Sequence, residues 1–467
     1  MKKINFKNHR ILKAGLILVL VAFISSCEWI DPELNVDPDA PGDVPMNLLV
    51  PAIQQNIGYN LLGNNSVRTT NIWMQYYDGV ARQSHTEARY QLTAADVNNY
   101  WSNIYTELLN ETKILAEKAV EEGSPHNEGM AKVMTAYTLG IASDLFGDIP
   151  YLDGLKGSEN VLKPVFDNQE VIYGSIFTLL DEALADLAST EELIGISGDV
   201  IFGGDADAWI AAAHAIYARA ELQLSKVNGS AAYTGALSHI ASAIASNGGD
   251  MEVPFESANQ NPVYQFMDQR TDIRFCQTFL DELNATADPR LAFYASPHPD
   301  AADDVITGSA PGAINENASF IGDYQAAQDA PVVLISYSEV KFIEAEALFM
   351  TGDAAGAADA FNAAVLASLE RVTGAADQEW MDANNITANA GNIDLETIIM
   401  QKRHALVGQI QPYSDWRRTG IPTLTLSIGA TKTEIPRRFP YSQDESIYNP
   451  DNVPSIGSII DPVWWDQ

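Results

Sequence analysis

The residues with the clearest chemical potential are aromatic and polar side chains that occur together in short stretches. Aromatic faces stack on the C–H surfaces of sugars, and amide, carboxylate and guanidinium groups hydrogen-bond to sugar hydroxyls. A first stretch, residues 73–83, supplies four candidate ligand-binding residues: Trp73, Gln75, Tyr76 and Arg82. Trp73 and Tyr77 would share one face of a helix, so the alternative is an aromatic stripe that packs this helix into the core.

A second stretch with the same chemistry spans residues 255–324. Its candidate ligand-binding residues are Asn259, Tyr264, Arg270 and Tyr324. The alternative is that these side chains anchor loops. Binding groups are nevertheless frequent on loops that a rigid scaffold positions, so the stretch stays a candidate site.

Motifs for enzyme activity are missing from the sequence. It contains no G-x-S-x-G, no G-x-x-x-x-G-K-[ST], no G-x-G-x-x-G and no H-E-x-x-H. A glycoside hydrolase needs only two carboxylates across a cleft, and the 62 Asp and Glu residues leave that possibility open. We expect a binding protein that is not an enzyme, with no catalytic residues, no cofactor and no metal ligands.

The first 26 residues predict export of the protein. Five Lys and Arg residues precede a short apolar run at residues 16–24, which is typical of a signal peptide. Ile24-Ser25-Ser26-Cys27 resembles a bacterial lipoprotein processing site, so Cys27 is predicted to carry the lipid. The alternative is a plain thiol beyond an ordinary cleavage site. Residues 27–45 are rich in Asp and Pro and are predicted to be an extended, lipidated tether.

Composition and charge limit the function further. A hydrophobic content of 46% and a charged content of 19% describe a globular protein. The formal net charge of −35 becomes −40 without the signal peptide, because five Lys and Arg and no Asp or Glu lie in it. Nucleic acid is therefore excluded as a partner. Cys27 and Cys276 are the only cysteines, and lipidation of Cys27 would preclude an intrachain disulfide.

Hydrophobic periodicity predicts a chain of helices, several of them in pairs. Gly352 and Asp353 separate two amphipathic helices within residues 336–369, in a pattern that resembles half of a tetratricopeptide repeat. Residues 84–93 read as a loop, and residues 247–330 as a loop-rich insert with one helix at 278–285. The remaining predicted helices span residues 46–62, 71–82, 94–122, 128–146, 170–188, 206–224, 232–245 and 395–406.

Four segments, in order, resemble the SusD/RagB family of outer-membrane nutrient-binding lipoproteins of Bacteroidetes. The first is the lipidation site with its tether, and the second is AYTLGIASDLFGDIPYLDGL at residues 136–155. The third is the hairpin at residues 337–360, with Glu344, Glu346, Gly352 and Asp353. The last, residues 399–448, holds QKRHALVGQ, DWRRTG and IPRRFPY. We interpret DWRRTG, residues 415–420, as a packed cluster of ion pairs and stacked rings.

The resemblance implies an all-α fold, in which tetratricopeptide-like helical pairs form a right-handed superhelical body. The loop-rich insert and an irregular C-terminal region would pack on that body, within one SusD-like domain at residues 46–467. The implied function is a lipid-anchored protein on the exterior face of the outer membrane. It would bind a nutrient, most often an oligosaccharide, and deliver it to a SusC-like TonB-dependent transporter. The alternatives are a peptide-binding member of the same uptake system and a helical-repeat scaffold that binds only proteins.

Overall fold

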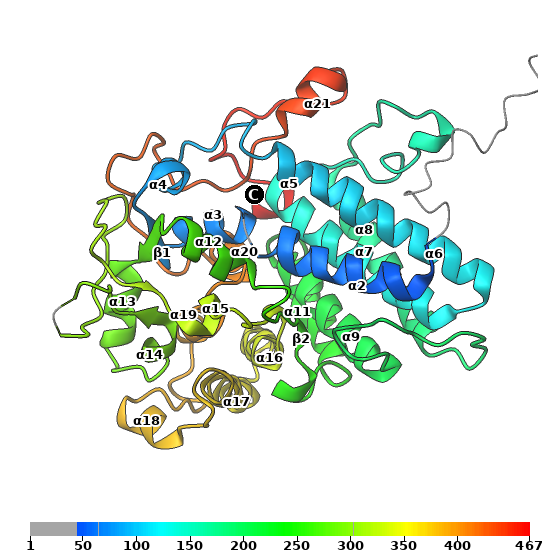
Figure 1. The fold of residues 1–467 in the computed structure, drawn as a ribbon. Coiled ribbons are helices and arrows are strands. Elements are labelled where there is room, and N and C mark those ends of the chain that lie inside the picture. Colours follow the sequence, from blue (N-terminus) through cyan, green and yellow to red (C-terminus); the bar gives the residue numbers. More distant parts are fainter. Residues whose placement is uncertain (1–43, 64, 302) are drawn as a thin grey trace, which may run out of the picture. The chain divides into compact units, whose positions relative to one another are not determined.

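Helices that pack against their neighbours in the sequence make up most of the protein (Figure 1). The computed structural model describes residues 44–63, 65–301 and 303–467. The predicted signal peptide, Cys27 and nearly all of the tether lie outside these residues. Residues 46–467 form one compact unit. In the described part of the chain, no helix is both long and apolar enough to cross a membrane.

The paired helices confirm the all-α prediction. Helix α7 packs on α6, α8 packs on α7, and α9 packs on α8. In the same way, α11 packs on α9, α16 packs on α11, and α17 packs on α16. Helix α19 closes the series against α16 and α17. The right-handed superhelical arrangement stays a prediction. The series comprises α6 (Asn110–Glu122), α7 (Pro125–Phe146), α8 (Gln169–Leu187), α9 (Ala206–Gln223), α11 (Ser230–Ile240), α16 (Tyr337–Thr351), α17 (Ala354–Thr373) and α19 (Leu395–Ala405).

The hairpin of α16 and α17 is built as the sequence predicts. Gly352 has φ +94°, a left-handed conformation that ends α16 without the steric cost of a side chain. Asp353 then caps α17 by accepting a hydrogen bond of 2.9 Å from the Gly356 N–H. Between the helices, Phe342 and Phe361 meet edge to face, with ring centroids 6.1 Å apart.

Two local predictions near residue 80 are wrong. The helix predicted at residues 71–82 ends at Trp73, as α3 (Asn65–Trp73), and the chain turns through Gln75 at φ +58°. Strand β1 (Tyr77–Gly79) follows and pairs with β3 (Ile273–Phe275), because tertiary pairing overrides the local helical pattern. The loop predicted from residue 84 begins inside helix α4 (Arg82–Ala88).

Three short antiparallel strand pairs organise residues 247–330 and their surroundings. Strand β2 (Met251–Val253) pairs with β6 (Val332–Ile335), so the two ends of this region meet just before α16. Strand β4 (Ala295–Ser296) pairs with β5 (Phe320–Ile321). The helix predicted at 278–285 is confirmed as α13. The four helices of this region are α12 (Pro262–Gln269), α13 (Gln277–Asn284), α14 (Leu291–Tyr294) and α15 (Asp323–Ala326).

The remaining elements lie around the helical series, and α20 lies near the centre of the view (Figure 1). The helix predicted at residues 46–62 is α2, continued by a π-helical turn, η3. The long helix predicted from residue 94 begins at Asn98 as α5 and reaches α6 through a second π-helical segment, η4. These elements are α2 (Met46–Asn56), η3 (Ile57–Leu61), α5 (Asn98–Asn103), η4 (Ile104–Leu109), α10 (Ser225–Asn228), α18 (Gln378–Ala383), α20 (Gln411–Thr419) and α21 (Gln443–Tyr448), with the 3-10 turns η5 (Gly157–Glu159), η6 (Asn247–Gly249) and η7 (Trp464–Asp466).

Four buried charged side chains connect α16, α19 and α20. Arg418 donates to Glu346 at 2.7 Å and to Asp415 at 3.0 Å. Lys402 lies 2.8 Å from the other oxygen of Asp415. Burial opposes ionisation of Asp415, but Lys402 and Arg418 overcome this and lower its pKa. The predicted ion-pair cluster in DWRRTG is therefore confirmed, and it reaches into the hairpin through Glu346.

Removing one carboxylate from this four-residue charge cluster should be costly. We expect Glu346→Gln to lower the free energy of unfolding by about 3 kcal/mol, because Arg418 keeps a buried charge with less compensation. Urea unfolding of a soluble form without residues 1–27 would measure this loss. The matched control is Glu117→Gln, in an exposed pair with Lys113 at 3.7 Å, which should cost about 0.5 kcal/mol or less. Equal losses in the two variants would contradict the role given to Glu346.

Candidate functional site

Three of the predicted binding residues lie in the core. Trp73, Gln75 and Tyr76 each have an exposed fraction of 0%. The Trp73 indole N–H donates to the Glu87 carbonyl at 3.1 Å, and the Tyr76 hydroxyl donates to the Arg403 carbonyl at 2.8 Å. The Gln75 amide donates to the Thr425 carbonyl at 2.5 Å. The structure therefore agrees with the alternative of an aromatic stripe that packs into the core.

Arg82 and Arg270 come together at the protein surface. The Arg82 side chain is 62% exposed, forms an ion pair with Asp272 and donates to the Arg270 carbonyl at 3.1 Å. Arg270 is exposed at the end of α12. Asn259 is also exposed and donates to the Gln55 amide oxygen of α2. Tyr264 is partly exposed on α12. None of these four residues lines the cavity described next.

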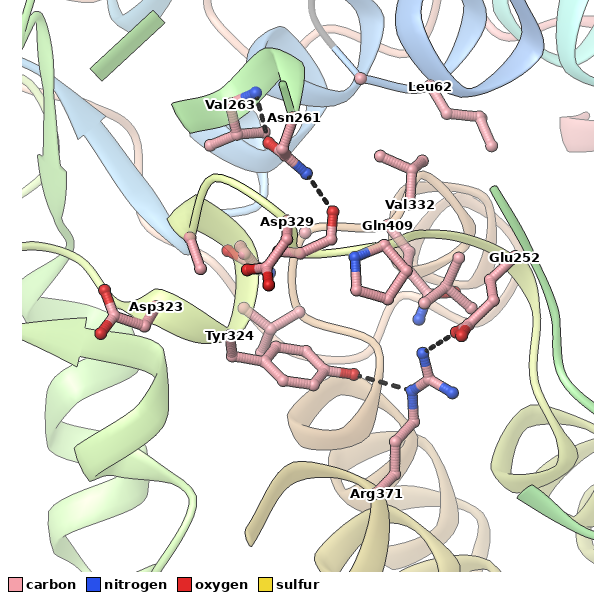
Figure 2. A pocket seen from close by; sticks show the side chains of 18 residues that line it. Leu62, Glu252, Asn261, Val263, Asp323, Tyr324, Asp329, Val332, Arg371 and Gln409 are labelled. Carbon is pink, nitrogen blue, oxygen red and sulfur yellow. Dashed lines mark hydrogen bonds and ion pairs between the residues drawn. The ribbon is translucent and has the colours of Figure 1, made fainter. Parts of the chain in front are cut away.

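A cavity of about 470 Å³ contains the last predicted residue, Tyr324. Figure 2 shows its lining side chains, which come from the segment after η3, from both ends of the insert, from β6, from α17 and from the segment after α19. We call it the Tyr324 cavity. Its polar lining residues are Glu252, Asn261, Asp323, Tyr324, Gln325, Asp329, Arg371 and Gln409, and its apolar lining includes Leu62, Val263, Pro331, Val332, Val333 and Val407.

Arg371, in the last turn of α17, fixes the position of Tyr324. Its Nε donates to the Tyr324 hydroxyl at 3.1 Å, and its other nitrogens pair with Asp250 and Glu252 (Figure 2). Burial alone would lower the pKa of Arg371, but Tyr324, Asp250 and Glu252 overcome this and raise it above its usual value. The ring of Tyr324 meets Tyr294 edge to face, with centroids 5.4 Å apart. The aromatic wall of the cavity is thus held by a charged contact on one side and a ring contact on the other.

Asn261 holds the opposite wall. It is 1% exposed, and its side-chain oxygen accepts the N–H groups of Val263 and Tyr264 at 2.7 and 3.0 Å, which caps α12. Its amide nitrogen donates to the Ala330 carbonyl at 2.7 Å. An aromatic ring, amides and carboxylates around one cavity can bind a polar ligand such as a sugar by stacking and hydrogen bonding. Among the described residues, no group of three or more His, Cys, Asp or Glu side chains is placed to hold a metal ion.

Comparison with protein families identifies the chain. A family model of SusD-like proteins, described as "Starch-binding associating with outer membrane", matches residues 39–442. The chain belongs to this SusD-like family. Members of the family are binding proteins associated with the outer membrane. A search of curated proteins finds no match.

Solved structures of SusD-like proteins share the fold. A chitin-binding protein superposes with a TM-score of 0.79 at 23% identity, over 91% of this chain and 100% of that one. A SusD/RagB family protein from Bacteroides thetaiotaomicron gives a TM-score of 0.77 at 24% identity, over 91% and 99%. A chitin-binding SusD homologue from Flavobacterium johnsoniae gives 0.74 at 20% identity, over 91% and 97%. These similarities confirm the predicted helical fold.

Sequence reasoning missed most of the residues around Tyr324 in this SusD-like chain. Glu252 could have been found, because it lies between the apolar residues Met251 and Val253. This alternation predicts a strand in which Glu252 points to the face opposite the two apolar side chains. Asn261 before Pro262 is a typical helix start, although that pattern does not indicate a cavity. Arg371 gives no signal, since only the packing of α17 against the insert brings it to Tyr324.

The buried cluster around Tyr76 makes the stability of this SusD-like protein dependent on pH. Arg403 lies over the Tyr76 ring at 4.2 Å and donates to the Glu282 carboxylate at 2.8 Å. Burial alone would raise the pKa of Glu282, but Arg403 and His404 lower it from 4.5 to about 2. The folded protein therefore holds a proton on Glu282 less readily than the unfolded chain does. This carboxylate stabilises the fold above its unfolded pKa, and the contribution disappears as the pH falls toward 2.

We expect the stability difference between the unmodified protein and Glu282→Gln to reach about 3 kcal/mol at neutral pH and to shrink below about pH 4. Urea unfolding across this range would measure the difference. Glu117→Gln serves as the control, with a small difference at every pH. A difference for Glu282→Gln that stays constant down to about pH 2.5 would contradict the assigned pKa.

Proposed function

We propose that this protein is a lipid-anchored nutrient-binding protein on the exterior face of the outer membrane. It captures an oligosaccharide in the Tyr324 cavity and delivers it to a SusC-like TonB-dependent transporter. Cys27 carries the lipid, and residues 28–45 connect that anchor to the folded unit. The protein binds its ligand without chemical conversion. The observation that carries the proposal is a cavity with a fixed aromatic ring and several polar groups in a SusD-like chain.

The names of two structural relatives favour a saccharide over a peptide. Both are described as chitin-binding, and both match more than nine-tenths of this chain. The lining supports the same choice, because it pairs Tyr324 with the amides of Gln325 and Gln409. Amides both donate to and accept from hydroxyl groups, and an aromatic face suits the apolar side of a sugar ring. Two alternatives are tested against this proposal. In these alternatives, the protein is either a peptide-binding member of the family or a scaffold that binds only proteins.

Purification of the intact lipoprotein from its native membrane tests the transporter part of the proposal. We expect a large TonB-dependent barrel in nearly equal amount, because a protein that passes its ligand to a transporter must remain beside it. Mass spectrometry of the co-purified material would identify the barrel. A Cys27→Ala variant is the control, since it should lose the membrane anchor. Recovery of the lipoprotein alone, under conditions that keep other membrane complexes intact, would count against the transporter.

A panel of neutral oligosaccharides tests the binding part. We expect Tyr324→Ala to weaken the tightest interaction about tenfold or more, because it removes the stacking surface. The matched variant Tyr324→Phe keeps the ring and loses only the hydroxyl that accepts from Arg371, so it should bind within about threefold of the unmodified protein. Isothermal titration calorimetry would measure both. Unchanged affinity in Tyr324→Ala would remove the cavity from the proposal, and a panel without any binding would favour the protein scaffold.

A further inference from the structure

Asp329 lies on a turn whose two flanking residues are held in place. The N–H of Asn261 donates to the Gln328 carbonyl at 2.9 Å, and the side-chain amide of Asn261 donates to the Ala330 carbonyl at 2.7 Å. Asn261 is itself buried and caps α12, so it has little freedom to move. Asp329 between these two anchors is exposed and lines the Tyr324 cavity. The backbone that carries the Asp329 side chain is therefore held in place before any ligand binds.

The charges of the lining do not balance. The charged lining residues are Glu252, Asp323, Asp329 and Arg371. The positive charge of Arg371 is already matched by Glu252 and by the buried Asp250 behind it. Within the described ranges, neither Asp323 nor Asp329 forms an ion pair with a Lys, Arg or His side chain. The cavity thus has an excess of negative charge and offers carboxylate oxygens as hydrogen-bond acceptors.

The two unpaired carboxylates differ in direction. Figure 2 shows the Asp329 side chain between Asn261 and Tyr324, whereas Asp323 lies well to the left, away from Tyr324 and Arg371. Asp329 is therefore the carboxylate placed to meet a ligand that lies against the Tyr324 ring. A cationic group on that ligand would supply the charge that the protein does not.

We infer that the Tyr324 cavity selects oligosaccharides that carry primary ammonium groups, and that Asp329 binds one of these groups. The inference rests on the proposed function and adds the chemical class of the ligand. An ammonium group donates up to three hydrogen bonds, and a bond to a carboxylate is stronger than one between neutral partners. Uronate or sulfate groups would instead meet a negative cavity whose single cation is already paired, so such ligands are rejected.

Three trisaccharides of equal length form the test: glucosamine trimer, N-acetylglucosamine trimer and galacturonate trimer. Calorimetry with a soluble form lacking residues 1–27, at about pH 6 so that the amines carry protons, would compare them. We expect the glucosamine trimer to bind about fivefold more tightly than its acetylated counterpart, and the galacturonate trimer to bind least. Asp329→Asn should abolish most of that preference, because the amide carries no charge to pair with an ammonium group.

The control variant Asp359→Asn removes one exposed carboxylate of α17 that does not line the cavity, and it should keep the full preference. Equal or tighter binding of the acetylated trimer would overturn the inference and leave the proposed function intact. A preference that survives in Asp329→Asn would overturn the role of Asp329. A lysine tripeptide that binds as tightly as the glucosamine trimer would overturn the choice of a sugar. Failure of every ligand, in a folded protein, would overturn the inference and count against the proposed function.

Discussion

The buried charges of Glu346, Lys402, Asp415 and Arg418 constrain the core of this structure, because they join the three helices α16, α19 and α20. Taking a charged group out of water costs several kcal/mol unless a partner of opposite charge lies within bonding distance. All four side chains are at most 6% exposed, so each must keep its partner. Their pairing therefore fixes α19 and α20 against the α16 and α17 hairpin, and a shift of any one helix would leave a charge unmatched.

Both candidate binding regions depend on helices held by this cluster. Arg403, next to Lys402 on α19, lies over the buried Tyr76 ring and pairs with Glu282. Arg371, at the end of α17, holds Tyr324 and Glu252 at the cavity and pairs with the buried Asp250 behind them. The insert is thus attached to the helical body through charged contacts, and its loops are positioned by a rigid scaffold. This arrangement is the one expected of a preformed binding site, whose groups need little ordering when a ligand arrives.

Aromatic residues serve two purposes in this protein, and their local sequence does not separate them. Trp73 and Tyr324 both lie near polar residues in the sequence. Trp73 contacts Tyr413 and Phe439, with centroids 5.7 and 5.4 Å away, whereas Tyr324 keeps part of its ring beside open space. The difference comes from segments more than 300 residues further along the chain that cover Trp73. A sequence window around either residue contains none of that information.

The amino-acid sequence was enough to predict the helical series, because hydrophobic periodicity and helix caps such as Gly352 and Asp353 act over a few residues. It also indicated the family through its motifs, and the structure shows that some of these motif residues make core contacts. Glu346, Asp415 and Arg418 come from these motifs and supply three of the four charges in the buried cluster. The folded chain was needed to show that residues 77–79 pair as a strand, that Trp73, Gln75 and Tyr76 are buried, and that Arg371 and Asn261 frame a cavity. These features depend on contacts between segments that are far apart in the sequence. The pattern of residues within one short segment does not predict such contacts.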